Sequence, residues 1–88
     1  MNYKLAKQLK DAGFEYSKAA SDQEFEEGII IVPTLSELIE ACGGEQKALL
    51  CLFVDGEERW SYSVDGKSGK VGKTPKEAVA NLYIELSK

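Results

Sequence analysis

The sequence predicts a single α+β domain, residues 1–88, in which helices cover mainly one face of a small antiparallel sheet of about three strands. Three observations favour this class. Two segments begin with Thr and carry Glu three residues later, as helices with a capping box do. A third segment places two strand-like runs on either side of an Asp-Gly pair, as a β-hairpin does. The predicted order is helix, strand, helix, hairpin, helix.

The first predicted helix spans about residues 3–12. Asn2 suits the N-cap position, because its short polar side chain can accept a hydrogen bond from a free amide of the first turn. Gly13 can adopt the left-handed backbone that ends a helix, and in such an ending Phe14 folds back onto Leu9. The end of the helix and one contact of the core are thus predicted together.

The acidic segment 15–27 shows no periodicity. We expect a loop there, with at most a short helical turn at residues 21–25, and a loop of this length is often functional. Residues 29–32 are β-branched throughout and are followed by Pro33, which indicates a short strand.

A second, short helix is predicted over about residues 35–42. Thr34 and Glu37 have the spacing of a capping box, and the glycine pair 43–44 ends the helix. A helix of this length is not stable alone, so packing must hold it in place.

The hairpin is predicted from two runs, residues 48–54 and 59–64, around Asp55 and Gly56. The turn holds either two residues or the four residues 55–58, and both choices give the same pairing parity. Tyr62 and its neighbours at 60 and 64 then share a face with Leu49, Cys51 and Phe53.

The first run of the hairpin is apolar on both of its faces. This pattern suits a central strand, with residues 29–32 as its neighbour. If no helix covers the second face, Leu50 and Leu52 form an apolar patch that could bind a partner or a second copy of the chain.

The last predicted helix starts at Thr74, with Pro75 at its first position and Glu77 where a capping box needs it. Its apolar stripe is expected to cover the sheet. In the Lys- and Gly-rich run 67–73 before this helix, Val71 is expected in a short edge strand.

The charge is unevenly distributed along the chain, which carries a net charge of −4. Between Glu15 and Arg59 there are eleven acidic and three basic residues, whereas the rest of the chain has eight lysines and four acidic residues. The acidic middle is either an ordinary solvated surface or a face for a basic partner. The candidate partner surface comprises Glu24, Glu26, Glu27, Leu50, Leu52, Glu57 and Glu58.

A second candidate site is a phosphate contact formed by Lys67, Lys70, Lys73, Thr74 and Lys76, near the start of the last helix. The segment superficially resembles a nucleotide-binding phosphate loop. That motif requires glycine five positions before Gly72, where the chain has Lys67.

Most catalytic chemistry is not supported by the sequence. There is no histidine, and Cys42 and Cys51 are too few and too far apart for a zinc site, so we expect two reduced thiols and no metal or cofactor. The serines lack an activating base and the paired carboxylates lie in predicted loops. No signal peptide or membrane span is recognisable. We therefore expect a non-enzymatic, cytoplasmic protein.

Residues 31–43 and 72–82, with the opening segment 4–14, resemble a group of small bacteriophage and prophage proteins. The resemblance implies a phage-encoded accessory protein acting in the host cytoplasm, and it transfers no functional residue. More weakly, a hairpin followed by Gly72, Thr74, Glu77 and Ala78 is similar to the HicB-type antitoxin domain. That similarity implies neutralisation of a small ribonuclease.

Three functional hypotheses follow. The first is a non-catalytic phage-type accessory protein that binds a host or phage macromolecule, a protein in our interpretation, through an acidic face or an apolar sheet face. The alternatives are a module that binds nucleic acid or phosphate through the 67–76 region, and a HicB-like antitoxin.

Overall fold

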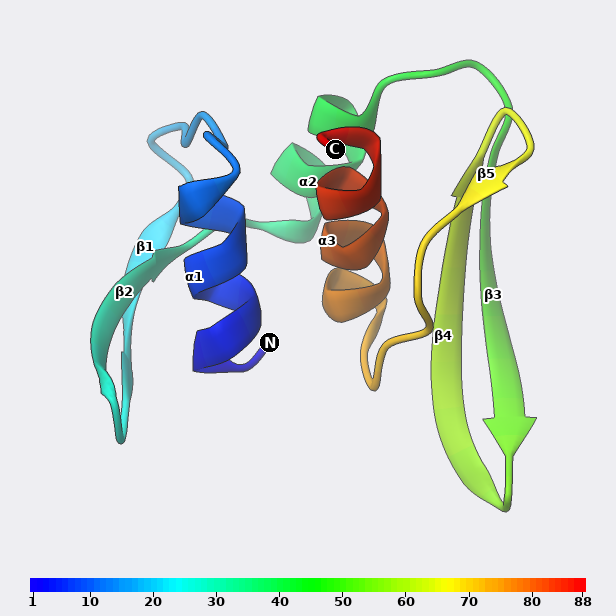
Figure 1. Ribbon diagram of the computed structural model, residues 1–88, viewed down its shortest axis with the longest axis horizontal. Coiled ribbons are helices and arrows are strands. Elements are labelled where there is room, and N and C mark those ends of the chain that lie inside the picture. Colours follow the sequence, from blue (N-terminus) through cyan, green and yellow to red (C-terminus); the bar gives the residue numbers. More distant parts are fainter.

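The computed structural model describes residues 1–88 and confirms an α+β fold with three helices. Its strands form two separate antiparallel sheets, where a single sheet was expected. The helices occupy the middle of the molecule, with a β-hairpin on one side and a three-stranded sheet on the other (Figure 1). The elements in chain order are α1 (Tyr3–Asp11), β1 (Ser21–Phe25), β2 (Gly28–Val32), α2 (Leu35–Cys42), β3 (Lys47–Val54), β4 (Glu57–Val64), β5 (Lys67–Ser68) and α3 (Pro75–Leu86). None of the helices is long and apolar enough to cross a membrane.

The ends of the helices follow the local sequence signals. At α2, Thr34 Oγ1 accepts a hydrogen bond from the Glu37 amide and Glu37 Oε2 accepts one from the Thr34 amide, each at 3.2 Å, so the predicted capping box is complete. At α3, Thr74 Oγ1 accepts from the Glu77 amide at 3.2 Å. The Glu77 carboxylate instead lies 3.8 Å from the ammonium group of Met1.

The end of α1 also forms as predicted. Gly13 has a φ of 83°, and the Phe14 amide donates a hydrogen bond to the Leu9 carbonyl at 3.2 Å. Both Leu9 and Phe14 are buried in the main core, so the turn that ends the helix also places an aromatic ring inside it.

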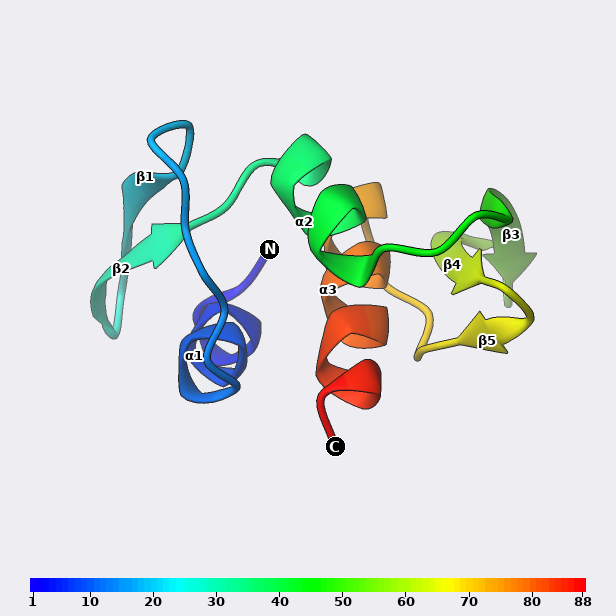
Figure 2. The same ribbon diagram turned by 90° about the horizontal axis from the view of Figure 1, so that it is seen from above.

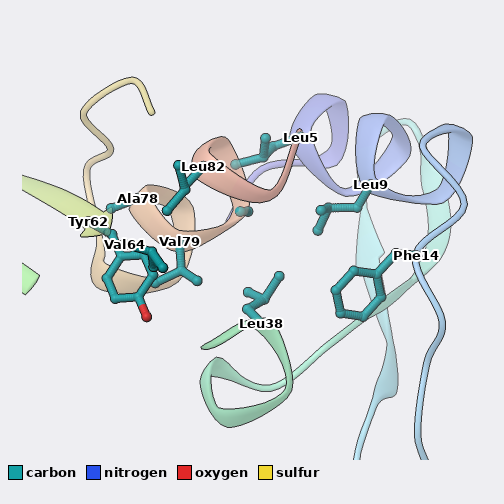
Figure 3. Packing of buried hydrophobic residues seen from close by; sticks show 10 residues of the cluster. Leu5, Leu9, Phe14, Leu38, Tyr62, Val64, Ala78, Val79 and Leu82 are labelled. Atoms are coloured by element: carbon teal, nitrogen blue, oxygen red, sulfur yellow. The ribbon is translucent and has the colours of Figure 1, made fainter. Parts of the chain in front are cut away.

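The main core lies between the three helices and the inner side of β4 (Figure 3). Helix α3 is at its centre, with four buried residues that meet α1, α2 and β4. The cluster consists of Leu5, Leu9, Phe14, Leu38, Tyr62, Val64, Ala78, Val79, Ala80 and Leu82.

Two glycines let the connector between β5 and α3 run directly against that helix. A Cβ atom at Gly69 would lie 2.6 Å from the Leu82 amide nitrogen, and one at Gly72 would lie 2.7 Å from the Ala78 amide nitrogen. Gly72 also exchanges two hydrogen bonds with Trp60. The connector thus fixes β4 beside α3.

The first hairpin corrects two expectations. Residues 21–25 form strand β1 rather than a loop or a helical turn, and β1 pairs with β2 through a register that places Phe25 opposite Gly28. Strand β2 is therefore not the neighbour of β3. Ile30 and Val32 of β2 pack with Ala6 of α1 in a second, smaller cluster.

The second hairpin has the predicted register but a different position in its sheet. Its turn holds the two residues Asp55 and Gly56, with φ values of 52° and 78°, and Leu49 lies opposite Tyr62. The strand order is β3-β4-β5, so β3 is an edge strand and not the expected central strand. The short edge strand β5 is Lys67–Ser68, and Val71 lies outside it.

Candidate interaction surface

Strand β3 is exposed along all eight of its residues, although six of the eight are large apolar side chains or cysteine. Phe53 is 77% exposed and Leu50 is 56% exposed, whereas the facing strand β4 buries Tyr62 and Val64. Strand β3 is the strand furthest from the helices in two perpendicular views (Figures 1 and 2). The apolar character of β3 is therefore not explained by contacts within one copy of the chain.

The pairing register assigns each side chain of the hairpin to one of two faces. The inner face, on the side of α3, carries Lys47, Leu49, Cys51, Phe53, Glu58, Trp60, Tyr62 and Val64. The helix-free face carries Ala48, Leu50, Leu52, Val54, Glu57, Arg59, Ser61 and Ser63. On the inner face, helix α3 packs mainly against β4, which leaves the β3 half of both faces exposed.

The outer edge of β3 carries backbone groups without a partner. Trp60 exchanges its hydrogen bonds with Gly72, on the side of β4 away from β3. Hydrogen-bonded and non-hydrogen-bonded residue pairs alternate along an antiparallel ladder. Trp60 and Cys51 therefore form a non-hydrogen-bonded pair, and Cys51 directs its own N–H and C=O away from β4. The same alternation turns the backbone groups of Leu49 and Phe53 outward. We call this row the β3 edge.

The predicted acidic residues do not form one face. Glu24, Glu26 and Glu27 belong to the first hairpin, whereas Glu57 and Glu58 belong to the second, on the other side of the helices (Figure 1).

Within the second hairpin the two glutamates differ. Glu57 lies on the helix-free face and forms an ion pair with Arg59. Glu58 lies on the inner face and accepts a hydrogen bond from the Cys51 thiol at 3.3 Å.

Three further acidic side chains line an open groove of about 440 Å³ that the sequence did not indicate; they are Glu15, Glu37 and Glu40. One of them has a structural role, since Glu37 Oε1 accepts a hydrogen bond from the Ser17 amide at 3.0 Å while Oε2 holds the helix cap. This carboxylate ties the segment before β1 to α2.

The predicted phosphate-contact residues are spread over β5, the connector and the start of α3. Of these lysines, Lys70 lines a small hollow of about 240 Å³ together with Lys4, and Glu77 lies in the same hollow. Asn81 holds this part of the connector by donating to the Lys70 carbonyl at 3.2 Å. The carboxylate reduces the attraction of this hollow for an anion.

The two thiols are free, and their surroundings favour the protonated form. Burial raises the pKa of Cys42 from its ordinary value of 9.0 to about 11, against a small opposite effect of Lys47. Desolvation, followed by the hydrogen bond and negative charge of Glu58, raises the pKa of Cys51. Because the thiolate is the nucleophile, neither environment activates its cysteine at neutral pH.

The structure places Leu50 and Leu52 on an open face, which the sequence analysis had expected only if no helix covered it, and adds Leu49, Cys51, Phe53 and Val54 to the exposed set. Leu49, Cys51 and Phe53 were expected to be covered by the last helix, which in the structure packs on β4 instead, and Val54 shares the open face with the two leucines. One signal in the sequence could have indicated that these residues are exposed. Apart from residues 59–64, the chain contains no alternating run that could pair with the other edge of β3.

No protein family, curated protein or solved structure matches this chain in the comparisons.

Proposed function

We propose that this protein is a non-catalytic accessory protein, of the type that phages encode, and that it binds a protein partner through the helix-free face of its second hairpin. The observation that carries the proposal is the row Leu50, Leu52 and Val54, which stand side by side on that face and are 56%, 38% and 47% exposed. Contiguous exposed apolar side chains with a polar rim are typical of protein interaction sites.

The surroundings of this row suggest what the partner presents. Glu57 and Asp55 lie at the turn end of the face, and Lys47 lies at the opposite end of β3. A matching partner segment would place apolar side chains on the leucines and a basic residue beside the turn. A small ribonuclease, the partner implied by the resemblance to HicB-type antitoxin domains, is one candidate of this chemistry.

The test uses a library of random peptides displayed on a carrier and selected against the whole protein. We expect enriched peptides to combine apolar and basic residues, and to lose binding to the double variant Leu50→Glu/Leu52→Glu. The matched control is Val71→Glu/Leu86→Glu, which replaces two apolar residues that are also exposed but lie elsewhere, at 48% and 39%. Binding that survives the first double variant, or is lost equally in the control, would exclude this face.

A further inference from the structure

We propose that two copies of this chain pair through their β3 edges, antiparallel and with Cys51 opposite Cys51, to form one continuous six-stranded sheet. The proposal extends the proposed function, because it identifies a partner for the edge of the same hairpin, and it uses different atoms. The helix-free face binds through side chains, whereas the β3 edge binds through the backbone.

The sequence of β3 does not match the position of this strand at the edge of its sheet. A strand that is apolar on both faces is typical of the interior of a sheet, where neighbours lie on both sides. In one copy, β3 has β4 on one side only. Pairing with a second β3 gives each strand the second neighbour that its sequence indicates.

The backbone of β3 is unpaired along its outer edge. Leu49, Cys51 and Phe53 direct their N–H and C=O groups outward, and no other element covers this side of the molecule (Figures 1 and 2). A long, apolar edge strand without charges in its interior is a template for another strand. The interior of β3, from Ala48 to Val54, contains no charged residue and no proline.

Two-fold symmetry limits the register in which two β3 strands can pair. A two-fold axis perpendicular to the sheet keeps the inner faces of both copies on the same side, so residues that pair must have the same parity. Because paired residues have the same parity, the axis must pass through a residue position of β3. That residue is either an outward-directed, odd-numbered one or an even-numbered one. Only a few registers then keep the strands aligned over their length.

Charge selects among these registers. With Cys51 on the axis, Leu49 meets Phe53, Leu50 meets Leu52, and Lys47 meets Asp55 of the second copy. With Leu50 on the axis, Asp55 would meet Glu45 of the second copy and Lys47 would meet Phe53. The first register pairs apolar with apolar and positive with negative at both ends, whereas the second places like charges opposite each other.

The same charge pattern favours a second copy over an unrelated strand. One end of β3 carries Lys47, and the other end carries Asp55 with Glu57 and Glu58 behind it. Antiparallel pairing of identical strands brings each positive end to a negative end twice. The resulting sheet also joins the helix-free faces of two copies into a single apolar surface around the axis.

The first test is sedimentation velocity over a wide range of protein concentration. We expect a monomer–dimer equilibrium whose dissociation constant rises more than about tenfold in Phe53→Lys, because each dimer then contains two ammonium groups in its seam. Phe53 is 77% exposed in one copy, so the substitution leaves the monomer folded. The control is Ile29→Lys, which changes an equally apolar residue, 69% exposed, on the other sheet.

The second test is disulfide trapping, which reads the register. In the Cys42→Ser background, oxidised glutathione accepts two electrons and two protons from the two Cys51 thiols and leaves as two molecules of glutathione. The paired Cα atoms would be ~5.5 Å apart, within the ~4.4–6.8 Å range of disulfides. Moving the thiol by one residue, in Cys51→Ser/Leu52→Cys, places the sulfurs on diagonal positions ~7–8 Å apart and should abolish trapping.

Three results would overturn the inference. They are a monomer at every concentration, equal dimerisation of Phe53→Lys and Ile29→Lys, or faster trapping at position 52 than at position 51. A monomer that still binds selected peptides through Leu50 and Leu52 would retain the proposed function and reject only the pairing of copies. A dimer that binds no peptide would support the pairing of copies and reject the proposed function.

Discussion

The β1–β2 hairpin and the β3–β4 hairpin lie on opposite sides of the helices, and each has one strand that packs on a helix, β2 on α1 and β4 on α3. The two hairpins differ in the other strand. In β1, the residues Ser21, Asp22, Gln23 and Glu24 are polar and exposed. In β3, the corresponding exposed positions are apolar. Charged edges oppose pairing with another strand, whereas apolar edges permit it. The proposed pairing of copies through β3, and not through β1, accounts for this difference.

Within the second hairpin, the largest contrast in stability is expected between two residues that face each other. Tyr62 is 3% exposed and Leu49 opposite it is 37% exposed. We expect Tyr62→Ala to lower the free energy of unfolding by about 3 kcal/mol and Leu49→Ala to lower it by less than about 1 kcal/mol. Urea denaturation measures both, and equal losses would show that β3 is packed in the monomer.

A control separates the ring of Tyr62 from its hydroxyl group. That hydroxyl is buried without a hydrogen-bond partner, and desolvation followed by the charge of Cys42 raises the pKa of Tyr62. Tyr62→Phe keeps the ring and removes the unsatisfied group, so we expect stability to be unchanged or to rise by about 1 kcal/mol. A clear loss would mean that the hydroxyl is bonded.

A matched pair of valines compares the two hairpins directly. Val32 of β2 is 5% exposed, and Val54 of β3 is 47% exposed. We expect Val32→Ala to cost about 2 kcal/mol and Val54→Ala to cost less than about 0.5 kcal/mol in dilute protein. The measurement is then repeated at high protein concentration, where the copies pair. Only the Val54 variant should then show a larger loss in the free energy of unfolding than it shows in dilute protein.

The cysteines extend the contrast to pH. Burial raises the pKa of Cys42 in the folded protein from 9.0 to about 11, so the folded chain holds this proton where the unfolded chain releases it. The contribution of this proton to the free energy of unfolding is fully present below pH 9 and is lost as the pH rises toward 11. After allowance for the half-exposed position, we expect a loss of about 1–2 kcal/mol.

Cys42→Ala should remove this part of the pH dependence, and the difference between the two denaturation series measures it. A Cys42→Ala variant with the same slope as the original protein above pH 9 would show that another group titrates there.

The smallest effects are expected at the carboxylates that anchor the hairpins. Glu37 accepts from the Ser17 and Thr34 amides, and Asp65 Oδ1 accepts from the Gln46 amide at 2.9 Å. We expect Glu37→Gln to cost about 1 kcal/mol and the more exposed Asp65→Asn about 0.5 kcal/mol. Both costs are small because the new side-chain amide keeps one oxygen that can accept a hydrogen bond. Denaturation of the two variants in parallel tests the order, and the reverse order would contradict this account of the first hairpin.

Local signals in the sequence were sufficient for much of the fold. The Thr34 cap, the Gly13 ending and the parity of the Asp55 turn each depend on residues close in sequence, and each was predicted. The pairing of β2 was wrong because its real partner, β1, is polar and lacks alternation. Local patterns do not indicate such a strand; contacts with α1 and β2 stabilise it instead.

The candidate site was predicted only in part, for a related reason. The two-sided apolar pattern of β3 was interpreted as a central strand, and Leu50 and Leu52 were noted as exposed only if uncovered. The same pattern is expected for an edge strand that a second chain completes. Sequence periodicity cannot distinguish these two cases, because both place apolar neighbours on each side of the strand.

Amide hydrogen exchange at rising protein concentration tests the central claim most directly. The outward-directed amides of Leu49, Cys51 and Phe53 should exchange fast in dilute protein and become protected as the concentration rises. The amides of Asp22 and Glu24, which alternation also directs outward from the first hairpin, should remain fast. Protection of the β3 amides that does not change with concentration, or that rises equally at β1, would contradict the account.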